Sequence, residues 1–117
     1  MPAGWCEQAA RKVRGRIRPH PGEGKPAIAL DDDLKRARCV VTWGSGAALK
    51  ALIAGVPVFY GMPKWIGAPA STLFAGDVSA PVLGDRLAMF RRLAWAMWSV
   101  DEIASGQPFA LLLPPAR

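Results

Sequence analysis

The spacing of apolar and polar residues predicts a strand, a helix and a second strand near the middle of the chain. Residues 39–43, CVVTW, are apolar on both faces, which is typical of a buried parallel strand. Residues 47–54 have helical spacing with Lys50 as the one strongly polar member, and residues 56–60 form the next apolar stretch. Gly55 and Pro57 end the helix. This order predicts a compact βαβ unit with parallel strands.

Further helices are predicted on both sides of this unit. The pattern favours helices over residues 5–13 and 31–38, the second with aspartates at its start and basic residues at its end. Residues 85–98 form the clearest helix, and one apolar stripe along it is expected to face the core. The members of that stripe are Leu87, Phe90, Ala94, Met97 and Trp98.

The C-terminal part of the chain carries a helix-start signal. Ser99 and Glu102 have the spacing of a capping box, and the short helix that follows them is expected to end at Gly106. Residues 1–106 are therefore expected to form a single domain, followed by a proline-containing tail over residues 107–117. Between the predicted sheet and these helices, residues 71–75 are expected to form one helical turn.

Composition narrows the class of protein. The chain has 117 residues, 51% of them hydrophobic, which is enough for a real core. Its net charge of +6 suits an anionic partner such as a phosphorylated small molecule, nucleic acid or a membrane surface. Cys6 and Cys39 are far apart and are expected to be reduced, and no pattern indicates a metal or a cofactor. The absence of a signal peptide or an apolar run of spanning length predicts a cytoplasmic protein without a membrane span.

The turn Gly44-Ser45-Gly46 is the first candidate site, because it lies where a predicted strand meets a helix. A helix N-terminus exposes unpaired N–H groups, and glycines allow a phosphate to approach the backbone closely. Ligands also collect at the carboxyl ends of parallel strands. The alternative is that Ser45 caps the helix and the glycines only permit a tight turn.

The segment RIRPHP supplies a second candidate. Arg14, Arg16 and Arg18 alternate with other residues, so a strand over residues 14–18 would place all three on one face before Pro19 stops it. His20, the only histidine, would then follow a strand end, where imidazole can hydrogen-bond a phosphate or ribose oxygen. Two parallel strands ending in His20 and in the glycine-serine turn would bring both to one edge of the sheet.

These motifs together resemble a known family. RIRPHPGE, followed by LDDDLKRARCVVTWGSGAALKALIAGVPVF, resembles the donor-binding half of GT-B-type glycosyltransferases, above all the capsular-polysaccharide biosynthesis proteins that include Kdo-transferases and polysialyltransferases. RRLAWAMWSVDEIASGQPF resembles the closing helices of such proteins less specifically. The resemblance implies an α/β fold, a Rossmann-like three-layer α/β/α arrangement with a small parallel sheet, as half of a GT-B fold.

The resemblance also implies roles for individual residues. His20 would contact the donor phosphate, with Arg18 as an accessory. Ser45 and the N–H groups of Gly46 and Ala47 would hold phosphate or ribose, and Thr42 could reach the same pocket. Gly44 stands where the family often has Asn, which removes one side-chain contact.

The catalytic residues are not identified. The acceptor-binding domain of the family has no counterpart in this sequence, and the aspartates 31–33 are candidate bases only if their helix faces the cleft. A site for a metal at these three aspartates is the weaker reading, because helix capping explains them.

Three functions remain open from the sequence. The first is a domain that binds a CMP- or UDP-linked sugar and needs a second domain or partner for transfer. The second is a non-catalytic nucleotide-binding or protein-interaction module, which could self-associate through exposed apolar faces. The third is a basic nucleic-acid-binding protein, which the Lys35, Arg36 and Arg38 run would favour, although the tryptophans are not interleaved with that run.

Overall fold

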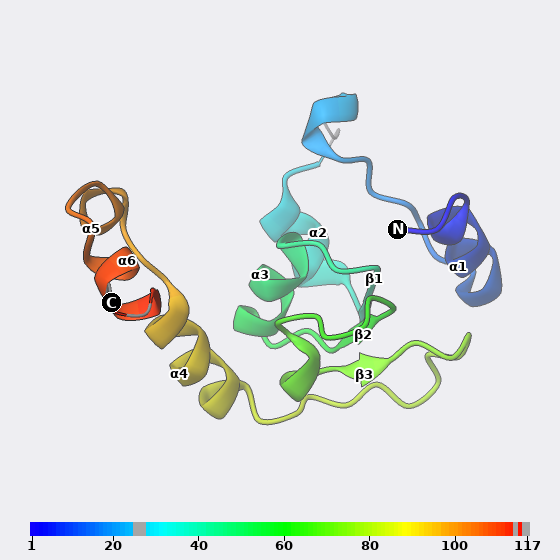
Figure 1. The fold of residues 1–117 in the computed structure, drawn as a ribbon. Helices are drawn as coiled ribbons and strands as arrows, with labels where there is room; N and C mark the ends of the chain where they lie inside the picture. Colours follow the sequence, from blue (N-terminus) through cyan, green and yellow to red (C-terminus); the bar gives the residue numbers. More distant parts are fainter. Residues whose placement is uncertain (25–27, 114, 116–117) are drawn as a thin grey trace.

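A small open sheet lies at the centre of the protein (Figure 1). The structure, a computed structural model, describes residues 1–24, 28–113 and 115. Strands β1 (Val40–Thr42), β2 (Val58–Tyr60) and β3 (Thr72–Leu73) are parallel and lie in the order β1-β2-β3. The predicted α/β class with a small parallel sheet is confirmed.

The predicted βαβ unit is present between β1 and β2. Helix α3 (Ala47–Ile53) connects these strands, which pair in register with Val40 opposite Val58. Gly55 ends the helix at φ +79°, a left-handed conformation that glycine adopts without strain. The chain then turns directly into β2, so the sequence pattern placed this unit correctly.

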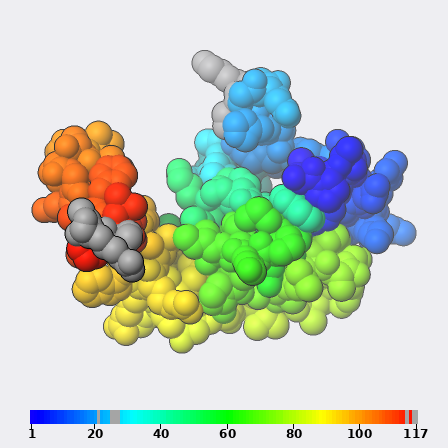
Figure 2. Space-filling view, in the orientation of Figure 1, coloured from blue at the N-terminus to red at the C-terminus, as the bar shows by residue number. Residues whose placement is uncertain are grey.

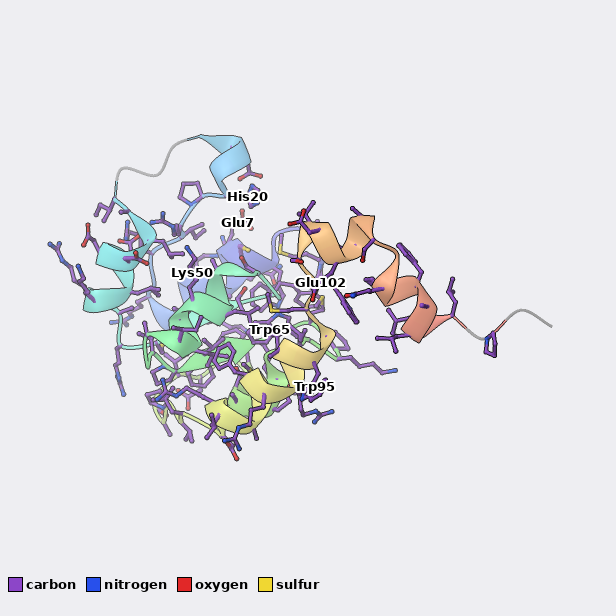
Figure 3. The ribbon with its side chains drawn as sticks, turned by 90° about the vertical axis from the view of Figure 1, so that its left-hand side faces the viewer. Glu7, His20, Lys50, Trp65, Trp95 and Glu102 are labelled. Carbon is purple, nitrogen blue, oxygen red and sulfur yellow. The ribbon has the colours of Figure 1, made fainter. Side chains whose placement is uncertain are left out.

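The core is built where α3 packs on the sheet. Ala48, Ala51 and Leu52 form the buried face of α3, and Val58 meets them from β2. Trp65, from the loop after β2, is also fully enclosed and lies in the middle of the molecule (Figure 3). The small residues of α3 allow close packing against the sheet on this face, whereas Ile53 on the other side is 68% exposed.

The remaining helices lie beside this centre or, at the C-terminal end, extend away from it. They are α1 (Trp5–Val13), η1 (Pro21–Glu23), α2 (Leu30–Arg36), η2 (Ala68–Ala70), α4 (Arg86–Ala96), α5 (Val100–Ala104) and α6 (Gln107–Leu112). The predicted helix over residues 5–13 coincides with α1. The predicted capping box is confirmed, because the Ser99 side chain accepts from the Glu102 N–H and the Glu102 carboxylate accepts from the Ser99 N–H.

The predicted strand over residues 14–18 is wrong. These residues are all described, and they form no strand. The alternating arginines still act on one side of the segment, because Arg16 and Arg18 both form ion pairs with Asp33 of α2. The arginines hold the segment against a helix, and side-chain pairing of this kind replaces the backbone pairing that a strand would need.

Three C-terminal predictions also need correction. Residues 72–73 form β3 where a helical turn was expected, and residues 107–112 form α6 within the expected tail. The predicted core stripe of α4 is wrong as well, because Met89 is its buried residue while Leu87 is 61% exposed. The Asp85 cap and the hydrogen bond from Arg86 Nη1 to the Leu52 carbonyl (2.8 Å) fix the rotation of α4.

The C-terminal helices form an arm that extends away from the centre. We define the C-terminal arm as residues 95–113. Figure 2 shows an open gap between α5 and α6 and the rest of the surface, with α4 joining the two parts. The Cα radius of gyration is 16.7 Å, against about 13 Å for a compact chain of this length. Within the described residues, no helix is long and apolar enough to cross a membrane.

Candidate functional site

The Gly44-Ser45-Gly46 turn connects the carboxyl end of β1 to the start of α3. Thr42, the last residue of β1, is buried, and its hydroxyl oxygen accepts a hydrogen bond from the Ser45 N–H at 2.9 Å. Thr42 therefore lies beneath the turn and positions Ser45. This contact explains why a hydroxyl-bearing residue ends an otherwise apolar strand, since a buried hydroxyl requires a partner.

The outer side of the turn faces solvent. Ser45, Gly46 and Ala47 are exposed, and the space where a Gly46 side chain would project holds no atom within 4 Å. The Ser45 hydroxyl oxygen accepts a hydrogen bond from the Ala47 N–H at 3.2 Å. Ser45 therefore caps one N–H at the start of α3, which is part of the alternative explanation for this turn. No acceptor among the described residues contacts the Gly46 N–H. The turn thus offers one unpaired donor and one rotatable hydroxyl to an anion.

Gly44 has a packing role. A Cβ at this position would lie 2.8 Å from the Met62 methyl group and 3.2 Å from the Met62 Cβ. Met62 therefore fills the space that a larger side chain before Ser45 would occupy. Sequence reasoning missed this contact, because Met62 belongs to the loop after β2 and approaches only in the folded protein.

Aromatic side chains cover part of the carboxyl edge of the sheet. Trp43 follows β1 and Phe74 follows β3, and Trp5 of α1 packs edge-on against both, with ring centroids 5.4 and 5.8 Å away. Gly61, which follows β2, lies against the Trp5 and Trp43 rings. The edge where ligands were expected to collect is thus closed by α1 beside the turn. The sequence signal that was missed is Gly61 at the end of an apolar strand. A glycine in such a place indicates that another part of the chain lies close to the backbone.

The structure does not bring His20 to this edge. His20 precedes η1 and is exposed, and its Nδ1 accepts from the Gly22 N–H at 3.1 Å. Figure 1 shows η1 standing apart from the sheet, and Figure 3 places His20 beside η1. The predicted meeting of His20 with Ser45 required a strand over residues 14–18, and that strand does not form.

The charged groups near this segment have their own partners. Arg18 donates to the Ile28 carbonyl at 2.8 Å and pairs with Asp33, so its guanidinium holds the loop onto α2. Burial raises the pKa of the Asp33 carboxyl, but hydrogen bonds and the charges of Arg16 and Arg18 outweigh it and lower that pKa below its ordinary value. Asp33 is therefore a poor general base, and Asp32 is paired with Lys35 at 3.0 Å.

Comparison with known proteins gives no relative to guide the assignment. No family model, curated protein or solved structure matches this chain. Any function must therefore be argued from the site itself.

Proposed function

We propose that this chain binds a nucleotide-sugar donor, linked to CMP or UDP, through its phosphate groups. The main support for this proposal is the turn at the end of β1. There Ser45, Gly46 and Ala47 face solvent, and the Gly46 N–H has no acceptor among the described residues. A phosphate oxygen at the open side of Gly46 would accept from this N–H and from the Ser45 hydroxyl. The open parallel sheet with α3 as its crossover is compatible with a Rossmann-like donor-binding half of a GT-B fold.

The donor site is assigned to the turn, and His20 is tested separately. His20 precedes η1 and lies outside the sheet, so a contact with the same phosphate would require this segment to approach the turn. Sugar transfer would also need an acceptor and a general base from a second domain or partner, because Asp33 is held by two arginines.

Calorimetric titration with CMP, UDP and their sugars tests this proposal. Gly46→Ala places a methyl group in the open space in front of the turn, and Ser45→Ala removes the hydroxyl. We expect Ser45→Ala to weaken binding about tenfold, since hydrogen bonds to a charged group contribute about 1.5–3 kcal/mol. Gly46→Ala should also weaken binding, because its methyl group occupies the space that the phosphate would enter. Ser105→Ala, on the far end of α5, is the matched control, and His20→Ala shows whether the imidazole takes part.

Two results would contradict the donor-binding proposal. One is a folded wild-type protein that binds none of these nucleotides. The other is unchanged affinity in both turn variants, which would locate nucleotide binding elsewhere.

A second candidate function, a protein-interaction module, is supported by the apolar surface of the C-terminal arm. Its largest apolar side chains are mostly exposed, among them Trp95 (88%), Val100 (81%) and Leu111 (74%). Figure 3 shows Trp95 on the outer side of α4. Exposed apolar patches of this extent are typical of interaction sites.

We assign a second copy of this chain as the occupant of the arm, on grounds of charge. The arm carries Asp101 and Glu102 and no Lys or Arg, whereas the whole chain has a net charge of +6. On the body, Lys50 and Ile53 share a face of α3, and both are exposed. An acidic, apolar arm is complementary to this basic, apolar face in another copy.

A further inference from the structure

Three cationic side chains from distant parts of the sequence line one hollow. Lys12 and Arg14 come from the end of α1, and Arg38 comes from the segment just before β1. The loop over residues 76–79 completes the lining of this hollow, which has a volume of about 220 Å³. Arg38 precedes β1 and Ser45 follows it, and the residues that line the hollow do not include the glycine-serine turn. We call this feature the basic hollow.

The positive charge of the basic hollow is not neutralised by ion pairs. The ion pairs among the described residues use Arg16, Arg18 and Lys35, and none uses the three cations of the hollow. Among the described residues of the lining, Asp77 is the one that is acidic. Both of its carboxylate oxygens accept from Ser79, at 2.9 Å from the backbone N–H and 2.6 Å from the hydroxyl. The hollow therefore retains an excess of positive charge.

Contacts with the loop hold two of these cations in place. The position of a Gly76 Cβ would lie 3.4 Å from Lys12 Cδ and 3.5 Å from Lys12 Nζ, so the loop packs on the lysine stem. Gly76 has φ +93°, which a larger residue would adopt only with strain. Arg38 Nη2 donates to the Ser79 carbonyl at 2.9 Å. The loop over residues 76–79 therefore contacts both Lys12 and Arg38.

Arg14 stands in a backbone conformation that usually belongs to glycine. It caps α1 at φ 52° and ψ 39°, in the left-handed region, where a side chain costs about 1 kcal/mol. An arginine, rather than a glycine, therefore ends α1 and lines the hollow. Strain of this kind is often found at functional sites.

We propose that the basic hollow binds the phosphate group of a small molecule, a monoester or a diphosphate. Two guanidinium groups can present paired N–H donors to phosphate oxygens, and the lysine adds a compact charge. The volume exceeds that of several water molecules, which take about 30 Å³ each, so a phosphate and part of its attached group can enter. The three cations line one hollow, and no aromatic residue among those that the structure describes lines it, which favours a small ligand over a nucleic-acid strand.

Titration of the wild-type chain at low salt with inorganic phosphate and with pyrophosphate tests this proposal. We expect saturable binding that is tighter for pyrophosphate, measured by calorimetry and by amide shifts at residues around the hollow that persist in the Ser45→Ala variant. Lys12→Gln and Arg38→Gln should each weaken binding at least about tenfold, the loss of one charge-assisted contact. Arg92→Gln, an exposed charge on α4, is the matched control and should leave the affinity unchanged.

The use of both Lys12→Gln and Arg38→Gln distinguishes lost phosphate binding from misfolding of one variant. Arg38→Gln removes the contact with Ser79, so circular dichroism must show that the variant is folded, whereas Lys12→Gln keeps that contact. Ser45→Ala should not affect phosphate binding here, because this site does not depend on the donor site. Absence of saturable phosphate binding, or equal weakening by Arg92→Gln, would overturn the proposal. Tighter binding of an oligonucleotide than of pyrophosphate, with a steeper salt dependence, would overturn it in favour of nucleic acid.

Discussion

At the scale of single residues, two glycines near the candidate site have opposite surroundings. Gly61 lies where Trp5 and Trp43 meet, and a Cβ there would be 2.7 Å from an atom of each ring. Gly46 faces open space and has φ −60° and ψ −26°, which any residue adopts. Packing therefore requires glycine at position 61. At position 46 the fold has room for a side chain, and only a bound ligand would require glycine.

Gly61→Ala should therefore destabilise the protein by about 1–3 kcal/mol, because the rings must move to admit the methyl group. Gly46→Ala should be neutral or slightly stabilising, because it restricts the unfolded chain without a clash. Urea unfolding followed by circular dichroism measures both. Equal stability of the two variants would contradict the close packing of α1 on the carboxyl edge of the sheet.

At the scale of elements, the sequence predicted those defined by local signals. Helix α1, helix α3 and strand β2 have continuous patterns and clear ends, and all were located correctly. Strand β3 was missed because its two residues are defined by pairing with β2 rather than by their own pattern. Likewise the turn at Ser45 could be identified, but the packing of Trp5 over the sheet edge could not, because nothing local couples α1 to β1 and β3.

The segment over residues 16–18 shows how an alternating pattern can be used without a strand. Its two arginines converge on Asp33, and their ion pairs join the segment to α2. The basic hollow was likewise not foreseen as one site. Arg14 and Arg38 were assigned from sequence to two separate basic segments, and nothing local indicates that they line one hollow together with Lys12 and the loop over residues 76–79.

The Asp33 ion pairs predict a pH dependence of stability. The folded-state pKa of Asp33 lies below its ordinary value of 3.8, so its contribution is present above that value and lost as the pH falls through the folded pKa. Asp33→Asn should lower the free energy of unfolding near pH 7 and make little difference at pH values below the folded pKa. Asp31→Asn is the control, since it shares the first turn of α2 without an ion pair among the described residues. Urea unfolding at both pH values measures these free energies. An equal loss of unfolding free energy in the Asp33→Asn and Asp31→Asn variants would contradict the role of the Asp33 ion pairs.

At the scale of the whole molecule, the body and the C-terminal arm differ in how much apolar surface they enclose. The core gathers around α3 and Trp65, whereas α5 has no buried residue and α6 buries only Pro108. The principal extents of 55 × 31 × 28 Å reflect this extension. Short helices are marginal alone, so a surface that covered this arm would stabilise it.

Self-association through the arm makes a prediction that sedimentation can test. The wild-type chain should form dimers in a concentration-dependent equilibrium, and Leu111→Asp should weaken it at least about tenfold, because a carboxylate in an apolar contact is costly. Leu111 is 74% exposed, so the monomer fold should tolerate the change; Val82→Asp, 58% exposed in the loop before α4, is the matched control. Lys50→Glu should also weaken the dimer, since it sets a negative charge against the acidic arm. A chain that stays monomeric at all concentrations, or a dimer that Val82→Asp disrupts equally, would show that the arm does not bind a second copy.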